Sequence, residues 1–171
     1  SGPLRSRKGT SWEGGLRVPF IARWPGVIPA CSVSHEPAMN IDIYPTLTTL
    51  AGSRLPTSQV VDGKNILPVL ANGENTPHEA LLLFNNDRIA GVRSGRWKLV
   101  VESFYRTAIS SFDNASSYYA PNGLLFDLEK DPSETYSYTR ENPSVATRLR
   151  KLLEAGQKEF SSTVLPDMWN R

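Results

Sequence analysis

Residues 7–26 read RKGTSWEGGLRVPFIARWPG, and the rest of the chain is most easily interpreted outward from them. Val18–Trp24 is a short apolar run that ends at a Pro-Gly turn, a pattern typical of a short buried strand. Before this run lies a basic loop in which Gly9 and the pair Gly14-Gly15 permit positive φ angles and close backbone approach. Lys8 stands at the mouth of the loop as a flexible point charge that can reach an anion. The stretch therefore predicts one half of an anion site.

The composition is that of an ordinary globular protein. The chain has 171 residues, of which 39% are hydrophobic and 21% charged, enough for one domain or for one domain and a piece of another. No run approaches the ~18 apolar residues of a membrane-spanning helix, and no apolar segment of a signal peptide follows the first charges. A chain that begins inside a motif-bearing loop, without Met, is expected to be the tail of something longer.

The net charge of +2 is too small to indicate nucleic-acid binding. Its distribution is uneven, because residues 1–24 hold five basic side chains against one acidic side chain. A local positive field suits an anionic ligand, whereas a solvated basic terminus would give the same pattern. Charge alone leaves both interpretations open.

Cysteine and histidine offer little chemistry. A single cysteine, Cys31, cannot form an internal disulfide, and we expect it to be a small, partly buried loop side chain. His35 precedes Glu36-Pro37 and His78 follows Pro77, so both are expected in loops. No set of metal ligands has a recognisable spacing.

Residues 40–52 predict a helix with Asp42 as its N-cap and Gly52 as its stop. Its apolar positions recur at helical spacing and are expected to bury one face of the helix. These positions are Ile43, Leu47, Leu50 and Ala51. Residues 61–70 predict a turn and one turn of helix, and residues 71–78 predict the crossing to a second part of the chain.

From residue 79 the pattern changes to short strands. We predict strands at 80–84, 88–92, 97–101 and 123–128, with a hairpin turn at 93–96, and hence an antiparallel sheet. A terminal helix begins at Pro143 after the cap Asn142 and runs to about Phe160, with an apolar stripe that covers the sheet. The segment is thus of the α+β type, with predicted divisions at 1–75 and 76–171.

Residues 102–122 interrupt this pattern with serine and aromatic side chains. Loops of that length are uncommon in compact domains and are often functional. Tyr105, Tyr118 and Tyr119 have rings of the kind that stack on sugars or aromatic groups, so they are candidate substrate-binding residues. A disordered insert is the equal alternative.

Lys-Gly-Thr-Ser-Trp-Glu-Gly-Gly-Leu-Arg-Val-Pro-Phe, residues 8–20, resembles the second signature region of the type I, formylglycine-dependent sulfatases of the alkaline phosphatase superfamily. Residues 90–99 and 125–136 resemble the C-terminal part of the same family. The resemblance implies an α/β fold in which residues 1–75 are the edge of the large domain. Residues 76–171 would then form a small four-stranded antiparallel sheet against a C-terminal helix.

The resemblance also implies a function, a sulfuric ester hydrolase in which Lys8 contacts the sulfate group of the substrate. The formylglycine nucleophile and the calcium ligands of such an enzyme are expected upstream of this chain, in the N-terminal part of the same sulfatase. The segment alone is therefore expected to be inactive. The insert tyrosines would lie near the substrate entrance, and the family implies an extracytoplasmic compartment.

Two alternatives stay open. One is a phosphonate or phosphate ester hydrolase of the same superfamily, and the other is a non-catalytic fragment or binding module that keeps the loop for packing. The upstream sequence would separate enzyme from scaffold.

Overall fold

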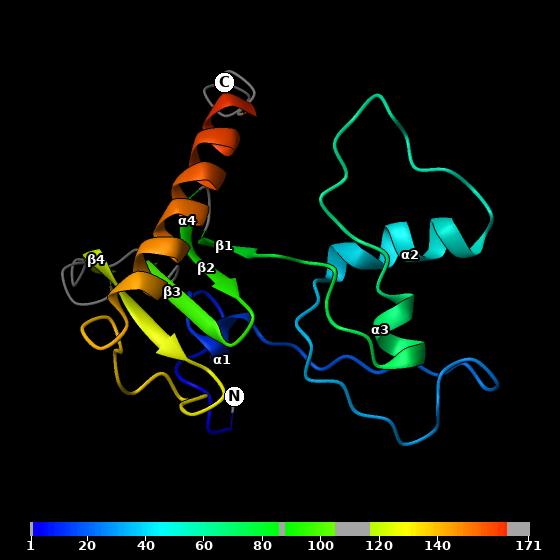
Figure 1. Ribbon diagram of the computed structural model, residues 1–171, viewed down its shortest axis with the longest axis horizontal. Helices are drawn as coiled ribbons and strands as arrows, with labels where there is room; N and C mark the ends of the chain where they lie inside the picture. Colours follow the sequence, from blue (N-terminus) through cyan, green and yellow to red (C-terminus); the bar gives the residue numbers. More distant parts are fainter. Residues whose placement is uncertain (1, 86–87, 105–116, 164–171) are drawn as a thin grey trace. The chain divides into compact units, whose positions relative to one another are not determined.

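The computed structural model describes residues 2–85, 88–104 and 117–163, and it divides into two compact units (Figure 1). The sheet unit comprises Ser1–Val18 and Ala80–Arg171, and the middle unit comprises Pro19–Glu79. The loop that carries Lys8 therefore packs with the C-terminal sheet, although it precedes the middle unit in the chain. The predicted domain boundary between residues 75 and 76 stays a prediction.

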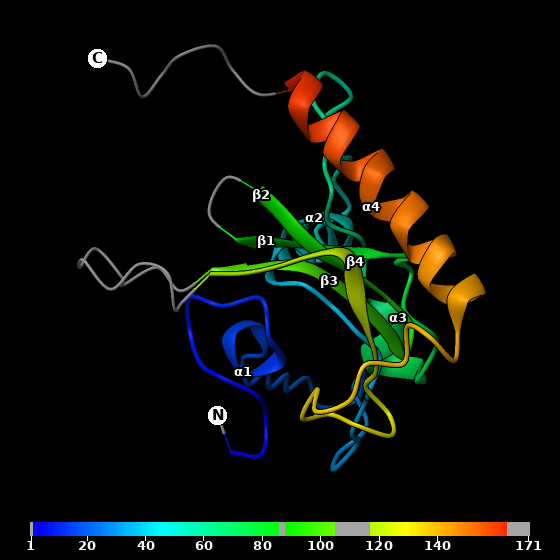
Figure 2. The same cartoon turned by 90° about the vertical axis from the view of Figure 1, so that its left-hand side faces the viewer.

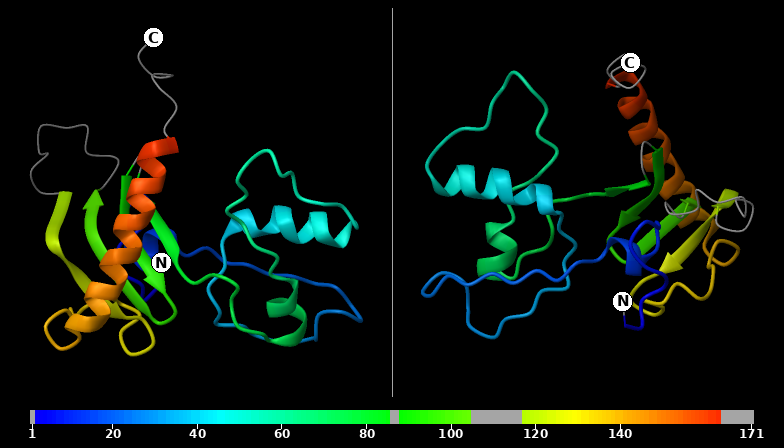
Figure 3. Two further views of the ribbon diagram at one scale, coloured as in Figure 1. Left: turned by 45° about the horizontal axis from the view of Figure 1, so that its top comes forward. Right: turned by 180° about the vertical axis from the view of Figure 1, so that it is seen from behind.

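The sheet unit contains the four-stranded antiparallel sheet that the sequence predicts (Figure 3). Its strands follow chain order: β1 Leu81–Asn85, β2 Arg88–Ser94, β3 Trp97–Phe104 and β4 Ser117–Asp127. The strands β3 and β4 are longer than predicted, so residues 102–104 and 117–122 belong to the sheet, not to a loop. Residues 102–104 of β3 pair with residues 117–119 of β4, so the sheet extends into the stretch that was predicted to be an insert.

The two faces of the sheet are covered by different elements, as Figure 2 shows. Leu99 and Leu125 pack under helix α4, Pro143–Thr163. The neighbouring residues Val100 and Phe126 point to the opposite face, where they contact Trp12 beside the short helix α1, Glu13–Leu16. Because side chains alternate along a strand, α4 covers one face of the sheet, and the loop that carries Lys8 covers the other.

Helix α4 confirms the predicted amphipathic helix. It begins at Pro143 and buries Ala146, Leu149 and Leu153 against the sheet. Gly156 has a packing role in this helix. A Cβ atom at residue 156 would lie 2.6 Å from the Leu82 side chain, so this glycine allows the helix to approach β1 closely.

The middle unit is built around a buried carboxylate. A 3-10 turn, η1 Asn40–Asp42, leads into α2 Ile43–Leu50, and α3 Leu67–Asn72 follows. The Asp42 side chain does not cap its own helix. It accepts hydrogen bonds from the backbone N–H groups of Met39 (2.7 Å) and Lys64 (2.8 Å) and contacts His78 Nε2 at 2.9 Å. His78 is therefore buried and paired, a role that the sequence did not indicate.

Several predictions for the middle unit are wrong. Residues 18–24 form no strand, and Ile21 is 91% exposed. The apolar residues of the 40–52 helix are not buried as expected. Ile43, Leu47, Leu50 and Ala51 are all exposed. Apolar periodicity marks a surface suited to burial, but within the described part of this unit these side chains stay exposed. Cys31 is exposed as well, with a positive φ of 59°.

Among the described residues, no helix combines the length and apolar character that crossing a membrane requires.

Replacing Asp42 with alanine should open the middle unit. The change would leave two part-buried N–H donors and the buried His78 without their acceptor, at a cost of about 3 kcal/mol. Amide hydrogen exchange of residues 39–78 would measure this cost. Asp62→Ala, at an exposed position in the same unit, is the matched control, and equal exchange in the two variants would contradict the assigned role of Asp42.

Candidate functional site

The lysine loop, residues 5–15, is closed by its own backbone. The Gly14 N–H donates to the Arg5 carbonyl oxygen at 2.9 Å, and the Thr10 hydroxyl donates to the Arg7 carbonyl oxygen at the same distance. Gly9 has a φ of 93°, in the left-handed region that favours glycine. Lys8 therefore sits in a turn whose shape is fixed by hydrogen bonds on both sides of it.

Gly15 packs directly against this turn. A Cβ atom at residue 15 would lie 2.4 Å from the Thr10 carbonyl oxygen and 2.8 Å from that of Arg7. The close approach predicted for the glycine pair is thus confirmed at Gly15. A side chain at this position would force the segment around Lys8 to move.

The base of the loop is anchored by an aromatic residue. Trp12 is buried and meets the Phe126 ring edge-to-face, with centroids 5.7 Å apart. The Arg5 guanidinium covers the Trp12 ring at 3.7 Å and also donates to the Glu134 carbonyl oxygen at 2.9 Å. Arg5, which the sequence counted as part of a positive field, thus has a structural role.

A buried cluster of charges lies beside Trp12. Lys98, fully buried in β3, donates from Nζ to Glu13 Oε1 at 2.8 Å, and its Nζ lies 2.8 Å from Glu134 Oε1. Glu134 Oε2 accepts a hydrogen bond from the Glu13 backbone N–H at 2.7 Å. The guanidinium groups of Arg17 and Arg93 approach the other oxygen of Glu13. We call Glu13, Lys98 and Glu134 the charge triad.

The two carboxyl groups of the triad have opposite pKa shifts. Burial alone would raise the pKa of Glu13, but Lys98 and then Arg17 outweigh it, so the pKa is lowered from its ordinary value. Burial raises the pKa of Glu134, and the attraction of Lys98 and the Glu13 N–H only partly offsets this effect. The Glu13 charge is thus the better stabilised of the two.

Sequence reasoning missed Lys98 and Glu134 as important residues. The signal for Lys98 is its place in β3, where alternation puts it on the same face as the buried Val100. Glu134 gives no such signal, because it lies in an irregular turn with a φ of 53°.

Lys8 itself is exposed, and no ion pair or hydrogen bond to another residue in the described part of the chain holds its ammonium group. Its role as a sulfate ligand stays a prediction. Tyr118 and Tyr119 lie in β4 opposite Ser103 and Glu102, but their side chains are outside what the structure describes, as is the whole of Tyr105. The grouping of these tyrosines with Lys8 also stays a prediction.

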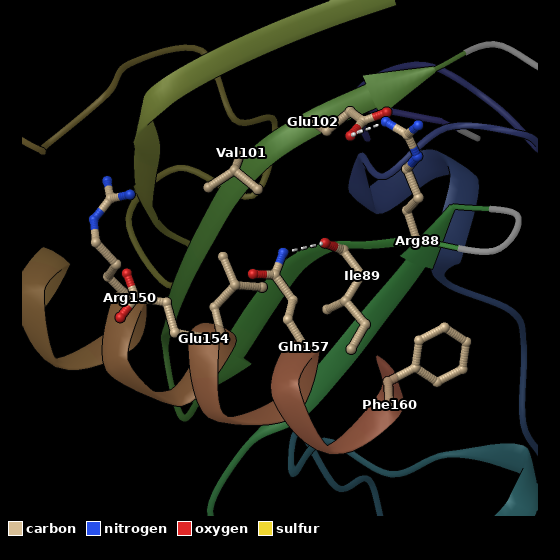
Figure 4. Close-up of a pocket in the computed structure, with 9 residues that line it drawn as sticks. Arg88, Ile89, Val101, Glu102, Arg150, Glu154, Gln157 and Phe160 are labelled. Carbon is tan, nitrogen blue, oxygen red and sulfur yellow. Dashed lines mark hydrogen bonds and ion pairs between the residues drawn. The ribbon is translucent and has the colours of Figure 1, made fainter. Parts of the chain in front are cut away.

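A groove of about 360 Å³ lies elsewhere in the sheet unit, between α4 and strands β2 and β3 (Figure 4). Gln157 donates to the Ile89 carbonyl oxygen across it, and Arg88 lies 3.8 Å from Glu102. Two arginines and two glutamates line the groove, so it has no net charge that favours an anion. Lys8, the candidate residue whose side chain the structure describes, does not line it.

The described residues contain no group of three or more His, Cys, Asp or Glu side chains that could hold a metal ion. The pair of Asp42 and His78 lacks a third ligand of this kind. The residues described here therefore do not fit the calcium ion that the family resemblance implies.

Comparison with known proteins identifies the class to which this fold and loop belong. A family model described as "N-sulphoglucosamine sulphohydrolase, C-terminal" matches residues 7–159. Arylsulfatase A of Homo sapiens is 38% identical over 151 residues, which cover 80% of this chain and 29% of that relative. The chain belongs to the sulfatase family, as a segment from its C-terminal part.

Solved structures support the same assignment. PsFucS1 sulfatase from Pseudoalteromonas sp. has a TM-score of 0.74 and 29% identity, over 95% of this chain and 34% of that one. A structure in complex with its substrate D-glucosamine-2-N,6-O-disulfate has a TM-score of 0.57 and 25% identity, over 82% and 28% of the two chains. The family and fold class predicted from the sequence are confirmed, and this chain spans about a third of the length of its relatives.

Acid should remove the stabilisation that the charge of Glu13 gives to the lysine loop. Because the pKa of Glu13 is lowered, its stabilising contribution is complete above its ordinary value of 4.5 and is lost as the pH falls through the lower folded value. The raised pKa of Glu134 acts in the opposite sense, since its protonation favours the folded state.

Hydrogen exchange of residues 5–17 below pH 4.5 would measure this loss of stabilisation. Glu13→Gln should weaken the dependence on pH, whereas Glu154→Gln, at an exposed position on α4, should leave it intact. An unchanged pH dependence in Glu13→Gln would show that another group is responsible.

Proposed function

We propose that this chain is the C-terminal portion of a sulfatase that hydrolyses sulfate esters, and that Lys8 binds the sulfate group. The observation that carries the proposal is an exposed Lys8 ammonium, with no partner among the described residues, on a loop that is fixed at its base. A cation in a preformed loop costs little reorganisation when it meets an anion.

The proposed role of Lys8 is electrostatic. Its ammonium group would donate hydrogen bonds to sulfate oxygens and stabilise the charge that develops on the ester and its leaving oxygen. A lysine suits this task because its three donors rotate freely on a flexible stem. Two other basic residues of this region have structural partners, Arg5 with the Trp12 ring and Arg17 with the Glu13 carboxylate.

The rest of the site is proposed to come from the N-terminal part of the same enzyme. The exposed apolar residues Ile43, Leu47 and Leu50 on α2, and Ile21 in the preceding segment, support such a partner, because a helix face of this kind is normally buried. The formylglycine nucleophile and the calcium ligands are assigned to that part. The formylglycine would supply the attacking group, and the calcium ion would offset the charge of the sulfate oxygens.

The proposed substrate is a sulfate ester carried on a sugar or aromatic ring. One support is the relative whose structure holds a disulfated glucosamine as its substrate. Another is the human relative that is named an arylsulfatase. The tyrosines Tyr105, Tyr118 and Tyr119 are proposed to contribute to the substrate entrance, and the enzyme is proposed to work outside the cytoplasm.

Replacing Lys8 with alanine in the intact enzyme should lower kcat/KM for an aryl sulfate by about 10²-fold, the typical effect of losing one donor to a developing oxyanion. Lys130→Ala removes another exposed lysine of the sheet unit and is the matched control. An unchanged rate in Lys8→Ala would remove Lys8 from the site.

The 171-residue chain alone should not hydrolyse an aryl sulfate, because the proposed nucleophile and metal ligands lie outside it. A continuous assay of released phenol, with the intact enzyme as the positive control, would measure this. Turnover by the isolated chain would refute the division of the site that we propose.

A further inference from the structure

The charge triad joins three segments that are far apart in the sequence. Glu13 belongs to the lysine loop, Lys98 to strand β3, and Glu134 to the turn that follows β4. Lys98 and Glu134 are fully buried, and Glu13 is nearly so. The triad is therefore the polar part of an interface that is otherwise made by Trp12 and its apolar neighbours.

Stability alone does not explain such a cluster. Removing charges from water is costly, and well-packed apolar side chains often stabilise a fold as well as a buried ion pair does. What charged hydrogen bonds add is direction, since each one fixes the relative position of two atoms. The triad is thus suited to hold the lysine loop in one defined place on the sheet.

The contacts to Glu13 show how that position is fixed. Its side chain is held by Lys98 and its backbone N–H by Glu134, so both the location and the rotation of the residue are restrained. The restraint extends along the loop, because the next residue, Gly14, bonds to Arg5, and Gly15 abuts the turn around Lys8. The charged groups that face Glu13 are Arg17, Arg93, Lys98 and Glu134.

We propose that Lys98 and Glu134 are positioning residues, which hold the Lys8 ammonium in register with the substrate sulfate by clamping Glu13. This proposal rests on the proposed function of Lys8. Neither residue touches the substrate in this scheme, and both act through the loop. A displacement of about 1 Å at a binding group can cost on the order of 10²-fold in rate, so the clamp has a measurable effect.

The test is a double-mutant cycle in the intact enzyme. Glu134→Gln keeps the size of the side chain and an acceptor for the Glu13 N–H, but it removes the charge that faces Lys98. We expect it to lower kcat/KM for an aryl sulfate by about 10-fold or more. In the Lys8→Ala background the same change should have little further effect, because the group that it positions is already gone. Lys98→Arg should retain more activity than Lys98→Met, since it keeps the cation.

Asp42→Asn is the matched control for loss of stability. Asp42 is a buried carboxylate of the middle unit, and its hydrogen bonds go to Met39, Lys64 and His78, not to the lysine loop. It should lower the thermal midpoint of the enzyme while leaving kcat/KM within about twofold of the parent, because it shares no described partner with the charge triad. Should Lys98→Met fail to fold, Glu134→Gln carries the test alone.

Three results would overturn the proposal. Full activity of Glu134→Gln would show that the clamp is not needed. An equal loss of activity from Glu134→Gln with and without Lys8 would show a general structural effect. An equal loss in Asp42→Asn would show the same. If Lys8→Ala itself has no effect, the proposed function fails first, which distinguishes the two failures.

Discussion

The sheet unit depends on one interaction, in which the fully buried Lys98 is held between the carboxylates of Glu13 and Glu134. Lys98 lies on the face of the sheet that α4 does not cover, and its two partners come from the beginning of the chain and from the turn after β4. Trp12 and Phe126 provide apolar burial beside it. Burial of apolar surface is non-directional, so it holds the segments together without fixing their positions. Charged hydrogen bonds are directional, so they fix the position of the loop on the sheet. The apolar contacts and the charged hydrogen bonds both hold the loop on which the exposed Lys8 lies.

The sequence was informative wherever the local pattern and the final environment agree. The four strands and α4 were predictable because their alternation and helical periodicity match surfaces that the same unit buries. The close packing of the lysine loop was predictable because glycine is the residue that lets two backbone segments approach each other, as Gly15 and the turn around Lys8 do. The sequence could not reveal the charge triad, because its three members are brought together by tertiary pairing. It also could not show that residues 18–24 and the apolar positions of α2 are exposed in the described part of the chain, since an apolar pattern does not identify its partner.

The middle unit is organised differently from the sheet unit. Its centre is the Asp42 carboxylate, which joins η1, the segment at Lys64 and His78 by hydrogen bonds. Much of its apolar surface points outward, including Leu47 and Ile21. A unit that is joined by a buried polar centre and has apolar side chains on its surface is suited to pack against another part of a larger protein. In the sheet unit, by contrast, the apolar side chains of both sheet faces have partners within the unit.

The backbone of Glu134 has a consequence for how this turn can vary. The residue adopts a φ of 53°, a left-handed conformation that glycine accepts freely and that costs other residues about 1–2 kcal/mol. Glycine at this position would relax the chain but would leave Lys98 with a single counter-ion. A residue at position 134 that keeps the contact with Lys98 must therefore adopt this left-handed conformation and also carry an acceptor.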